Sequence, residues 1–426
     1  MPTSPRRTVL WVVAAALAAL LYGPAYLAVV RPPPGFVGDF VQDWLSARDH
    51  DAGLPVYGDL RAALFRHTGL IPDPRDEFLA VNAHPPASVL LVLPLAPLGP
   101  AEAHFVWNLV TLPLAGLAVW LVVRELGCRP GWRGVVVAVA LGLPCAPLFD
   151  QVMFGQFNAL LVFLLAAAWA ADRRGLPWLA GACVGVAAAV KLFPAFVALY
   201  FVAAGRWRAV AATVIAFVGV NAAAAGVLGS ETFRVYVAEV VPAVSGEFAG
   251  VWRNLSAESY WLRALAPPPQ SRIDPAPSFP VLARALIVAS QLAVVGAVAW
   301  TAWAGRATTT GRDRAYAAAC AGMLLLAPTS WPHYFLLLAV PVGLLVARLP
   351  AGPGRWAMWA CLAVAWLSDT QAAKLVLGPE RAFAMIKNRH DPLTPAENLL
   401  VASLQTYALA GLFALTLRLP RDPPPS

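Results

Sequence analysis

Apolar runs long enough to cross a lipid bilayer recur along this chain. The first extends from Thr8 to about Val30, and a helix needs about 20 apolar residues to cross the hydrocarbon core. Only 13% of the residues are charged, whereas soluble domains carry about 25%. The pattern predicts an all-α polytopic membrane protein in which residues 1–426 form a single integral membrane domain.

Arginines gather in alternate short loops between these runs, and cytoplasmic loops are enriched in Lys and Arg. Placing the arginine-bearing loops inside predicts about 12 transmembrane helices with both chain ends in the cytoplasm. Residues 86–98 are apolar but too short for an ordinary span, and the count rises to about 13 if they cross. The expected spans lie near residues 8–30, 101–123, 134–149, 157–172, 177–190, 192–205, 208–228, 281–304, 315–330, 334–348, 356–372 and 396–417. The net charge of +8 therefore reports topology and does not point to a nucleic-acid partner.

Residues 31–85 are not apolar enough to span. They hold eight acidic residues, Asp39, Asp43, Asp49, Asp51, Asp59, Asp73, Asp76 and Glu77, against five arginines. A net-acidic loop suits the outer face of the membrane. The same path places the other polar segments outside, namely 150–158, Lys191, the second outer loop 229–280, 328–334 and 373–395. Their clustering on one face predicts one site, and we expect juxtamembrane helices in the first loop.

Asp39 and Asp43 are the candidate catalytic acids. They are four residues apart, so on a helix they share a face. A carboxylate held over the membrane surface can act as a general base toward a hydroxyl within hydrogen-bond reach. The alternative is that Asp39 is a solvated helix N-cap.

Lys191 lies between apolar segments, where a lysine at a helix centre costs roughly 3 kcal/mol. Pro194 follows closely and prevents normal continuation of a helix. A lysine at such a break suits an anionic group at the membrane surface. The alternative is snorkelling of its ammonium group to the lipid headgroups.

Gln156 and Asn158 follow Gly155 at the mouth of an expected helix. Amides both donate to and accept from phosphates and sugar hydroxyls, so both residues are candidate substrate ligands, with helix capping as the alternative for Asn158. Trp331 and His333 lie in a Trp-Pro-His-Tyr turn between two apolar runs. This histidine can contact a phosphate or orient a sugar hydroxyl, or it can be structural.

The second outer loop mixes aromatic, amide, hydroxyl and arginine side chains, including Asn254, Ser256 and Arg263. That mixture suits carbohydrate binding. No glycine-rich phosphate loop is present, which weighs against a nucleotide-sugar donor. The five cysteines form no CxxC pair and no histidine cluster has ligand spacing, so neither a disulfide framework nor a metal site is predicted.

Taken in order, these polar segments resemble the family-87 glycosyltransferases, which are polyprenyl-phosphate-mannose-dependent mannosyltransferases of the GT-C class. The resemblance covers roughly residues 36–345. Its motifs are Asp39-Phe40 with Trp44 and Ala47, Gly53 and Tyr57, His84-Pro85-Pro86 with the apolar run to Pro97, Gly155-Gln156 with Asn158, Ala180-Gly181, Lys191 with Pro194, Gly205-Arg206-Trp207-Arg208, Asn254 with Ser256 and Arg263, and Ser330-Trp331 with His333-Tyr334.

Three of these motifs depart from the family pattern. His84 stands where members have the Tyr of Tyr-Pro-Pro, and Leu255 stands where many have the Gln of Asn-Gln-Ser. Asp43 occupies a place where members often have an aromatic residue. The resemblance assigns the catalytic base to Asp39 by its place in the motif, and the choice between Asp39 and Asp43 stays open.

The resemblance implies a GT-C-like helix bundle that transfers a hexose, mannose by the family's preference, from a polyprenyl-phosphate donor to a glycolipid or glycan acceptor. Transfer would occur by inverting displacement at the outer face of the cytoplasmic membrane, among membrane lipids and with no soluble cofactor. Lys191, with His333, would stabilise the departing phosphate. The alternatives are a transporter or flippase of lipid-linked sugars, and a non-catalytic subunit of an envelope-assembly complex.

Overall fold

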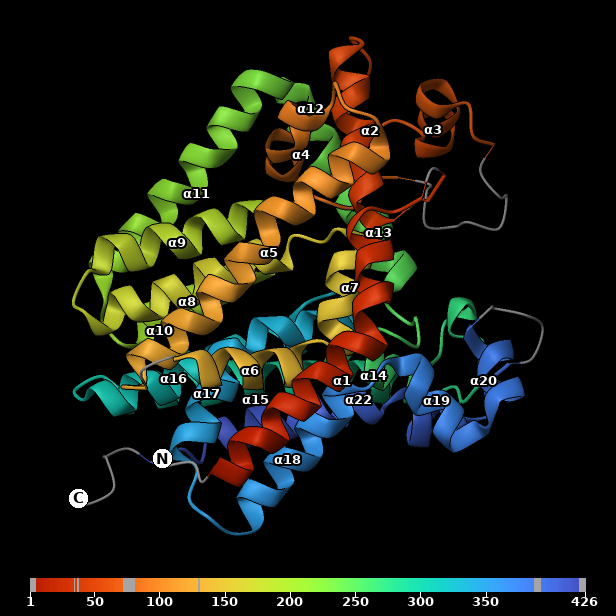
Figure 1. The fold of residues 1–426 in the computed structure, drawn as a ribbon. Coiled ribbons are helices and arrows are strands. Elements are labelled where there is room, and N and C mark those ends of the chain that lie inside the picture. Colours follow the sequence, from red (N-terminus) through yellow and green to blue (C-terminus); the bar gives the residue numbers. More distant parts are fainter. Residues whose placement is uncertain are drawn as a thin grey trace. The chain divides into compact units, whose positions relative to one another are not determined.

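The computed structural model describes residues 5–33, 35–36, 38–71, 81–128, 131–386 and 392–420. Within these residues the regular elements are helices, apart from an isolated parallel bridge between Ile273 and Leu393. Figure 1 labels the helices and colours them along the chain. The prediction of an all-α fold is confirmed. Asp73, Asp76 and Glu77 of the first loop lie outside the described residues.

Chain contacts divide the protein into two units. The first comprises residues Met1–Ala170, Ala182–Leu192 and Ala212–Val244. Its helices are α1 (Pro5–Val30), α2 (Asp39–Asp51), α3 (Leu60–Thr68), α4 (Pro86–Val92), η2 (Leu93–Leu95), α5 (Pro100–Glu125), α6 (Trp132–Gly142), α7 (Ala146–Phe154), α12 (Ser230–Val235) and the π-helical η4 (Tyr236–Val240). Four more helices have residues in both units: α8 (Asn158–Arg173), α9 (Pro177–Val190), α11 (Trp207–Leu228) and α13 (Val241–Phe248).

The second unit comprises Ala171–Gly181, Phe193–Ala211 and Ser245–Ser426. Its helices are η3 (Phe193–Val197), α10 (Ala198–Ala203), α14 (Ala257–Leu265), η5 (Pro269–Ser271), α15 (Pro280–Gly305), α16 (Thr309–Leu326), η6 (Pro332–Leu338), α17 (Ala339–Arg348), α18 (Pro353–Trp366), α19 (Asp369–Leu377), α20 (Pro379–Ile386), α21 (Pro395–Glu397), η7 (Asn398–Ala402) and α22 (Leu404–Thr416).

Four helices of the described chain are long and apolar enough to cross a membrane: α1, α5, α11 and α15. Large apolar side chains on them are exposed, among them Leu20 at 72% and Leu292 at 65%. A helix that is apolar on its exposed side as well as its packed side is solvated by lipid rather than water. These four helices therefore indicate that the protein is embedded in a membrane.

Bends interrupt three of the expected spans. The segment expected at 134–149 is two helices, α6 and α7, that meet at 78°, because Pro147 begins a new helix at the first turn of α7. The segment expected at 356–372 bends by 103°, where Ser368 caps α19, and the segment expected at 396–417 bends by 47°. Counting each bent pair as one span gives up to seven spans, so the expected count of 12 or 13 is not confirmed.

Helix α2 forms within the first loop, as expected, and α3 follows it. Asp39 lies in the first turn of α2 and Arg48 in its last turn. These charges complement the helix dipole at both ends of α2. Every residue from Asp39 to Ala47 is buried. The indole nitrogen of Trp44 donates to the carbonyl of Leu98 (3.1 Å) and Phe40 stacks on Trp107. These contacts hold α2 against α5 and the segment that precedes it.

Candidate active site

Helix α2 brings both candidate acids into the interior of the first unit. Asp39 is 9% exposed and Asp43 is fully buried. The N-cap of α2 is Gly38, and no side chain caps the helix. The alternative that Asp39 is a solvated N-cap is therefore wrong.

A glycine turn delivers the amide that Asp39 meets. Helix α7 ends at Gly155, which has φ 65°. A Cβ atom there would lie 2.6 Å from the Cβ of Phe40 and 2.8 Å from Nε2 of His104, so only glycine allows α2 to approach this turn. The chain then presents Gln156, which is 2% exposed.

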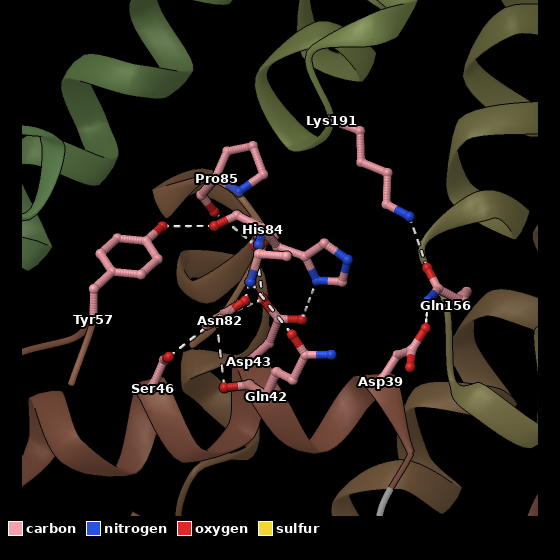
Figure 2. A network of polar contacts seen from close by, with 12 residues as sticks. Asp39, Gln42, Asp43, Ser46, Tyr57, Asn82, His84, Pro85, Gln156 and Lys191 are labelled. Atoms are coloured by element: carbon pink, nitrogen blue, oxygen red, sulfur yellow. Dashed lines mark hydrogen bonds and ion pairs between the residues drawn. The ribbon is translucent and has the colours of Figure 1, made fainter. Parts of the chain in front are cut away.

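Gln156 joins Asp39 to Lys191. Its Nε2 donates to Oδ2 of Asp39, and its Oε1 accepts from Nζ of Lys191 at 2.7 Å, as Figure 2 shows. We call these three residues the carboxylate–lysine chain. Lys191 follows the last residue of α9 and is 5% exposed. Burial lowers the pKa of Lys191 to about 8, while the carboxylates of Asp39 and Asp43 oppose the shift.

Asp43 has a different set of partners. Its Oδ1 accepts from Oγ of Ser88 at 2.7 Å and from Nδ2 of Asn82 at 3.4 Å. Its Oδ2 lies 2.7 Å from Nδ1 of His84. The carboxylate is thus enclosed by three protein partners. A carboxylate that is buried and bound in this way has little capacity to take a proton directly from a substrate hydroxyl.

Asn158 begins α8 two residues after Gln156 and is fully buried. Within the part of the chain that the structure describes, neither atom of its amide group has a hydrogen-bond partner. The side chain therefore does not cap the helix. A buried, unsatisfied amide costs about 1–3 kcal/mol per group, and this cost supports a role in ligand binding.

In the second unit, Asn254 and Ser256 bind only protein groups in the contacts observed. The amide of Asn254 donates to the carbonyls of Phe248 (3.0 Å) and Pro328 (2.8 Å) and accepts from the backbone of Ser256 and Ser330. The hydroxyl of Ser256 accepts from the backbone nitrogen of Ser259 (3.1 Å) and caps α14.

Arg263 is 1% exposed and lies at the centre of the same region. Its Nε donates to Oδ1 of Asn398, its Nη1 to the carbonyls of Val251 and Asn254 and the hydroxyl of Ser259, and its Nη2 to the hydroxyl of Ser403. We call these interacting side chains the Arg263 cluster: Asn254, Ser256, Ser259, Arg263, Asn398 and Ser403. It joins the second outer loop to the segment around η7, and this geometry fits a structural role.

Trp331 and His333 stand at the start of η6 in the second unit. Trp331 packs edge-on against Phe248 with ring centroids 5.4 Å apart, and His333 is 6% exposed beside the ring of Tyr334. Their role in substrate binding stays a prediction.

Two partners of Asp43, Asn82 and Ser88, were not predicted from the sequence. Asn82 and Ser88 flank the His84-Pro85-Pro86 motif, within four residues of His84. This proximity to the motif was the available signal. In the described ranges, no group of three or more His, Cys, Asp or Glu side chains could hold a metal ion.

Comparison with known proteins identifies the family of this chain. The family model described as Glycosyltransferase family 87 matches residues 82–328, a range that includes Asn82, His84, Gln156 and Lys191 but begins after α2.

Relatives are similar over most of their length. A polyprenol-phosphate-mannose-dependent alpha-(1-2)-phosphatidylinositol pentamannoside mannosyltransferase of Mycolicibacterium smegmatis is 27% identical over 309 residues, 69% of this chain and 70% of the relative. A protein of the same name in Mycobacterium tuberculosis is 28% identical over 327 residues, which are 72% of this chain and 70% of the relative. A Mycobacterium tuberculosis enzyme named for phosphatidylinositol mannoside is 26% identical over 296 residues, 62% of each chain. The family model covers more than half of the length of this chain, so the chain is a glycosyltransferase that belongs to family 87.

Proposed function

We propose that this enzyme transfers mannose from a polyprenyl-phosphate donor to a phosphatidylinositol mannoside or a related glycolipid. The relatives' names supply the substrate classes. The observation that carries the proposal is the carboxylate–lysine chain, which holds a proton acceptor and a cation on opposite ends of one buried amide. Such a pair fits a reaction that deprotonates a hydroxyl and releases an anionic phosphate.

The proposed reaction is a single inverting displacement. The acceptor oxygen bonds to the anomeric carbon of the sugar as the bond from that carbon to the phosphate oxygen breaks. Asp39 takes the proton of the acceptor hydroxyl, and polyprenyl phosphate leaves with the bonding electrons. Lys191 stabilises the charge that develops on the phosphate, where a low dielectric strengthens the interaction.

Asp39 is the better base of the two acids. Asp43 already accepts from Ser88, Asn82 and His84 and is fully buried. Asp39 retains 9% exposure. Gln156 fixes Asp39 and Lys191 relative to one another, and the unsatisfied amide of Asn158 is assigned to the sugar or the phosphate.

We further propose that the first loop faces outward from the cytoplasmic membrane and that the chain crosses it about 12 or 13 times. Support comes from four arginines of the second unit. Each lies in a different loop, and all four loops are predicted to be cytoplasmic. Arg206 and Arg312 pair with Asp172, and Arg173 and Arg348 pair with Asp313. Loops that meet in this way lie on the same side of a membrane.

The topology is tested by labelling cysteines in intact spheroplasts with an impermeant maleimide. Ala52 is exposed at the end of α2, so Ala52→Cys in a Cys128→Ser background should react before lysis. The native Cys128 is exposed in a loop predicted to be cytoplasmic, so it should react only after lysis. The reverse pattern would invert the topology.

The function is tested with purified protein in nanodiscs that contain a phosphatidylinositol mannoside acceptor. Labelled polyprenyl-phosphate mannose should yield a mannosylated glycolipid, and labelled nucleotide-mannose should not. A chelator should leave the rate unchanged, because the donor carries the activated sugar and no cofactor is proposed. Absence of transfer from every polyprenyl-phosphate sugar, together with movement of intact donor across proteoliposomes, would replace the proposal with the transporter alternative.

A further inference from the structure

Asp43 and His84 form a second hydrogen-bonded pair in the first unit, beside the carboxylate–lysine chain. Nδ1 of His84 lies 2.7 Å from Oδ2 of Asp43, and the two side chains are 12% and 0% exposed. Asp43 also accepts from the hydroxyl of Ser88 and the amide of Asn82. A fully buried carboxylate is stable only when it is paired and hydrogen-bonded, and the imidazole of His84 is one of its three protein partners.

The imidazole ring is held in a fixed orientation. The carbonyl of His84 accepts from the hydroxyl of Tyr57 at 2.6 Å, and its backbone nitrogen donates to Oδ1 of Asn82 at 2.9 Å. Pro85 and Pro86 follow and restrict the backbone. The ring of Phe157 packs edge-on against the imidazole, with centroids 5.3 Å apart. Within the described part of the chain, Nε2 is the ring nitrogen with no hydrogen bond.

Nε2 faces the carboxylate–lysine chain. Phe157, which contacts the imidazole, is the neighbour of Gln156 in the sequence. In Figure 2 the ring lies between Asp43 and the Lys191–Gln156 pair, with its second nitrogen on the side of that pair. The carboxylates of Asp39 and Asp43 both interact electrostatically with the ammonium group of Lys191. The imidazole of His84 and the carboxylate–lysine chain are therefore neighbours within the first unit.

Hydrogen-bond chemistry separates the roles of the two ring nitrogens. An ionised carboxylate only accepts hydrogen bonds, so Nδ1 of His84 donates to Asp43. Nε2 is the ring atom left for a substrate, and a phosphate oxygen is an acceptor to which a protonated Nε2 can donate.

We propose that His84 is a substrate-contacting residue that donates from Nε2 to a phosphate oxygen of the lipid-linked sugar donor, and that Asp43 is the positioning residue that orients its ring. The inference rests on the proposed function, since that function supplies the phosphate. His84 neither gives up nor gains a proton in the reaction: its hydrogen bond stabilises the phosphate as the bond to the sugar breaks, while Asp39 takes the acceptor proton. The ammonium group of Lys191 and the imidazole of His84 together then contact the leaving phosphate.

The test compares two lipids that differ only in charge, polyprenyl phosphate and polyprenol, binding to the full-length protein in nanodiscs. His84→Gln should weaken polyprenyl phosphate binding by about 10- to 100-fold, the range of a charge-assisted hydrogen bond, and leave polyprenol binding unchanged. Asp43→Asn should weaken phosphate binding by only about 3- to 10-fold, because the amide oxygen still accepts from Nδ1 of His84 but through a neutral hydrogen bond about half as strong.

His67→Gln is the matched control, because His67 also pairs with a buried aspartate, Asp49, at 2.7 Å, but that carboxylate is shared with Arg66. This variant should bind both lipids as the wild type does. Equal loss of both lipids in His84→Gln would show a merely structural role and overturn the proposal, as would unchanged phosphate binding.

If Asp43→Asn fails to fold, the His84→Gln and His67→Gln comparison decides alone. Failure of the proposed function would look different: wild-type protein would bind polyprenyl phosphate selectively but transfer no sugar.

Discussion

The carboxylate–lysine chain of the first unit and the Arg263 cluster of the second unit both bury polar side chains in an apolar protein. In the Arg263 cluster one cation is surrounded by neutral oxygens, and its Nε, Nη1 and Nη2 each donate to the protein. In the carboxylate–lysine chain an anion and a cation meet through one bridging amide. In the first arrangement the protein itself satisfies the polar groups and holds loops together, whereas we propose that the second arrangement presents a base and a cation to a substrate.

The comparison predicts its largest effect at Asp39. Asp39→Asn keeps the shape of the side chain and can still meet Gln156, but it cannot take a proton as a carboxylate does. Turnover should fall by about 10²- to 10⁴-fold, the usual contribution of a general base. Asp43→Asn should cost far less, because Asp43 acts through His84. If Asp43→Asn is the inactive variant and Asp39→Asn remains active, the base has been assigned to the wrong carboxylate.

A smaller effect is expected at Lys191. Lys191→Met keeps the length of the side chain and removes its charge, so the donor phosphate loses a charge-assisted hydrogen bond worth about 1.5–3 kcal/mol. The KM for the polyprenyl-phosphate donor should rise by about 10- to 100-fold, and the protein should still insert in the membrane. If folded Lys191→Met has the same KM and turnover as the wild type, Lys191 does not bind the donor phosphate, and its ammonium group instead lies at the lipid headgroups.

The smallest effect on turnover is expected in the Arg263 cluster. Arg263→Met leaves the buried acceptors on Asn398, Val251 and Asn254 without their donor, at about 1–3 kcal/mol for each. Thermal stability should therefore fall, while turnover per folded molecule stays roughly that of the wild type. Arg253→Met, a half-buried arginine of the same loop that stacks on Trp252, is the control and should lower stability less. Loss of turnover at full stability would make Arg263 a substrate ligand.

Local sequence patterns predicted the positions of the helices better than the bends between consecutive helices. Each expected span corresponds to helical residues, but the pattern could not reveal the bend between α6 and α7, because an apolar run looks the same whether or not Pro147 starts a new helix. Asp39, Gln156 and Lys191 stood out as polar residues in apolar surroundings, and the structure joins them.

The rest of the site depends on contacts between residues far apart in the chain. Ser88 meets Asp43 across 45 positions and Asn82 meets it across 39, and no local periodicity encodes such pairs. Composition predicts that Asn254, Ser256 and Arg263 suit a sugar, and that role stays a prediction. Composition could not reveal that each of them also binds other groups of the protein.

A single-turnover experiment tests the central claim most directly, namely that the carboxylate–lysine chain acts chemically on a bound lipid-linked sugar. Wild-type protein and Asp39→Asn are loaded in nanodiscs with labelled polyprenyl-phosphate mannose, a phosphatidylinositol mannoside acceptor is added, and both products are quantified. Wild-type protein should give equal amounts of mannosylated glycolipid and polyprenyl phosphate, while Asp39→Asn should hold the donor intact. Intact donor in the wild type, or equal product formation in both proteins, would contradict the account.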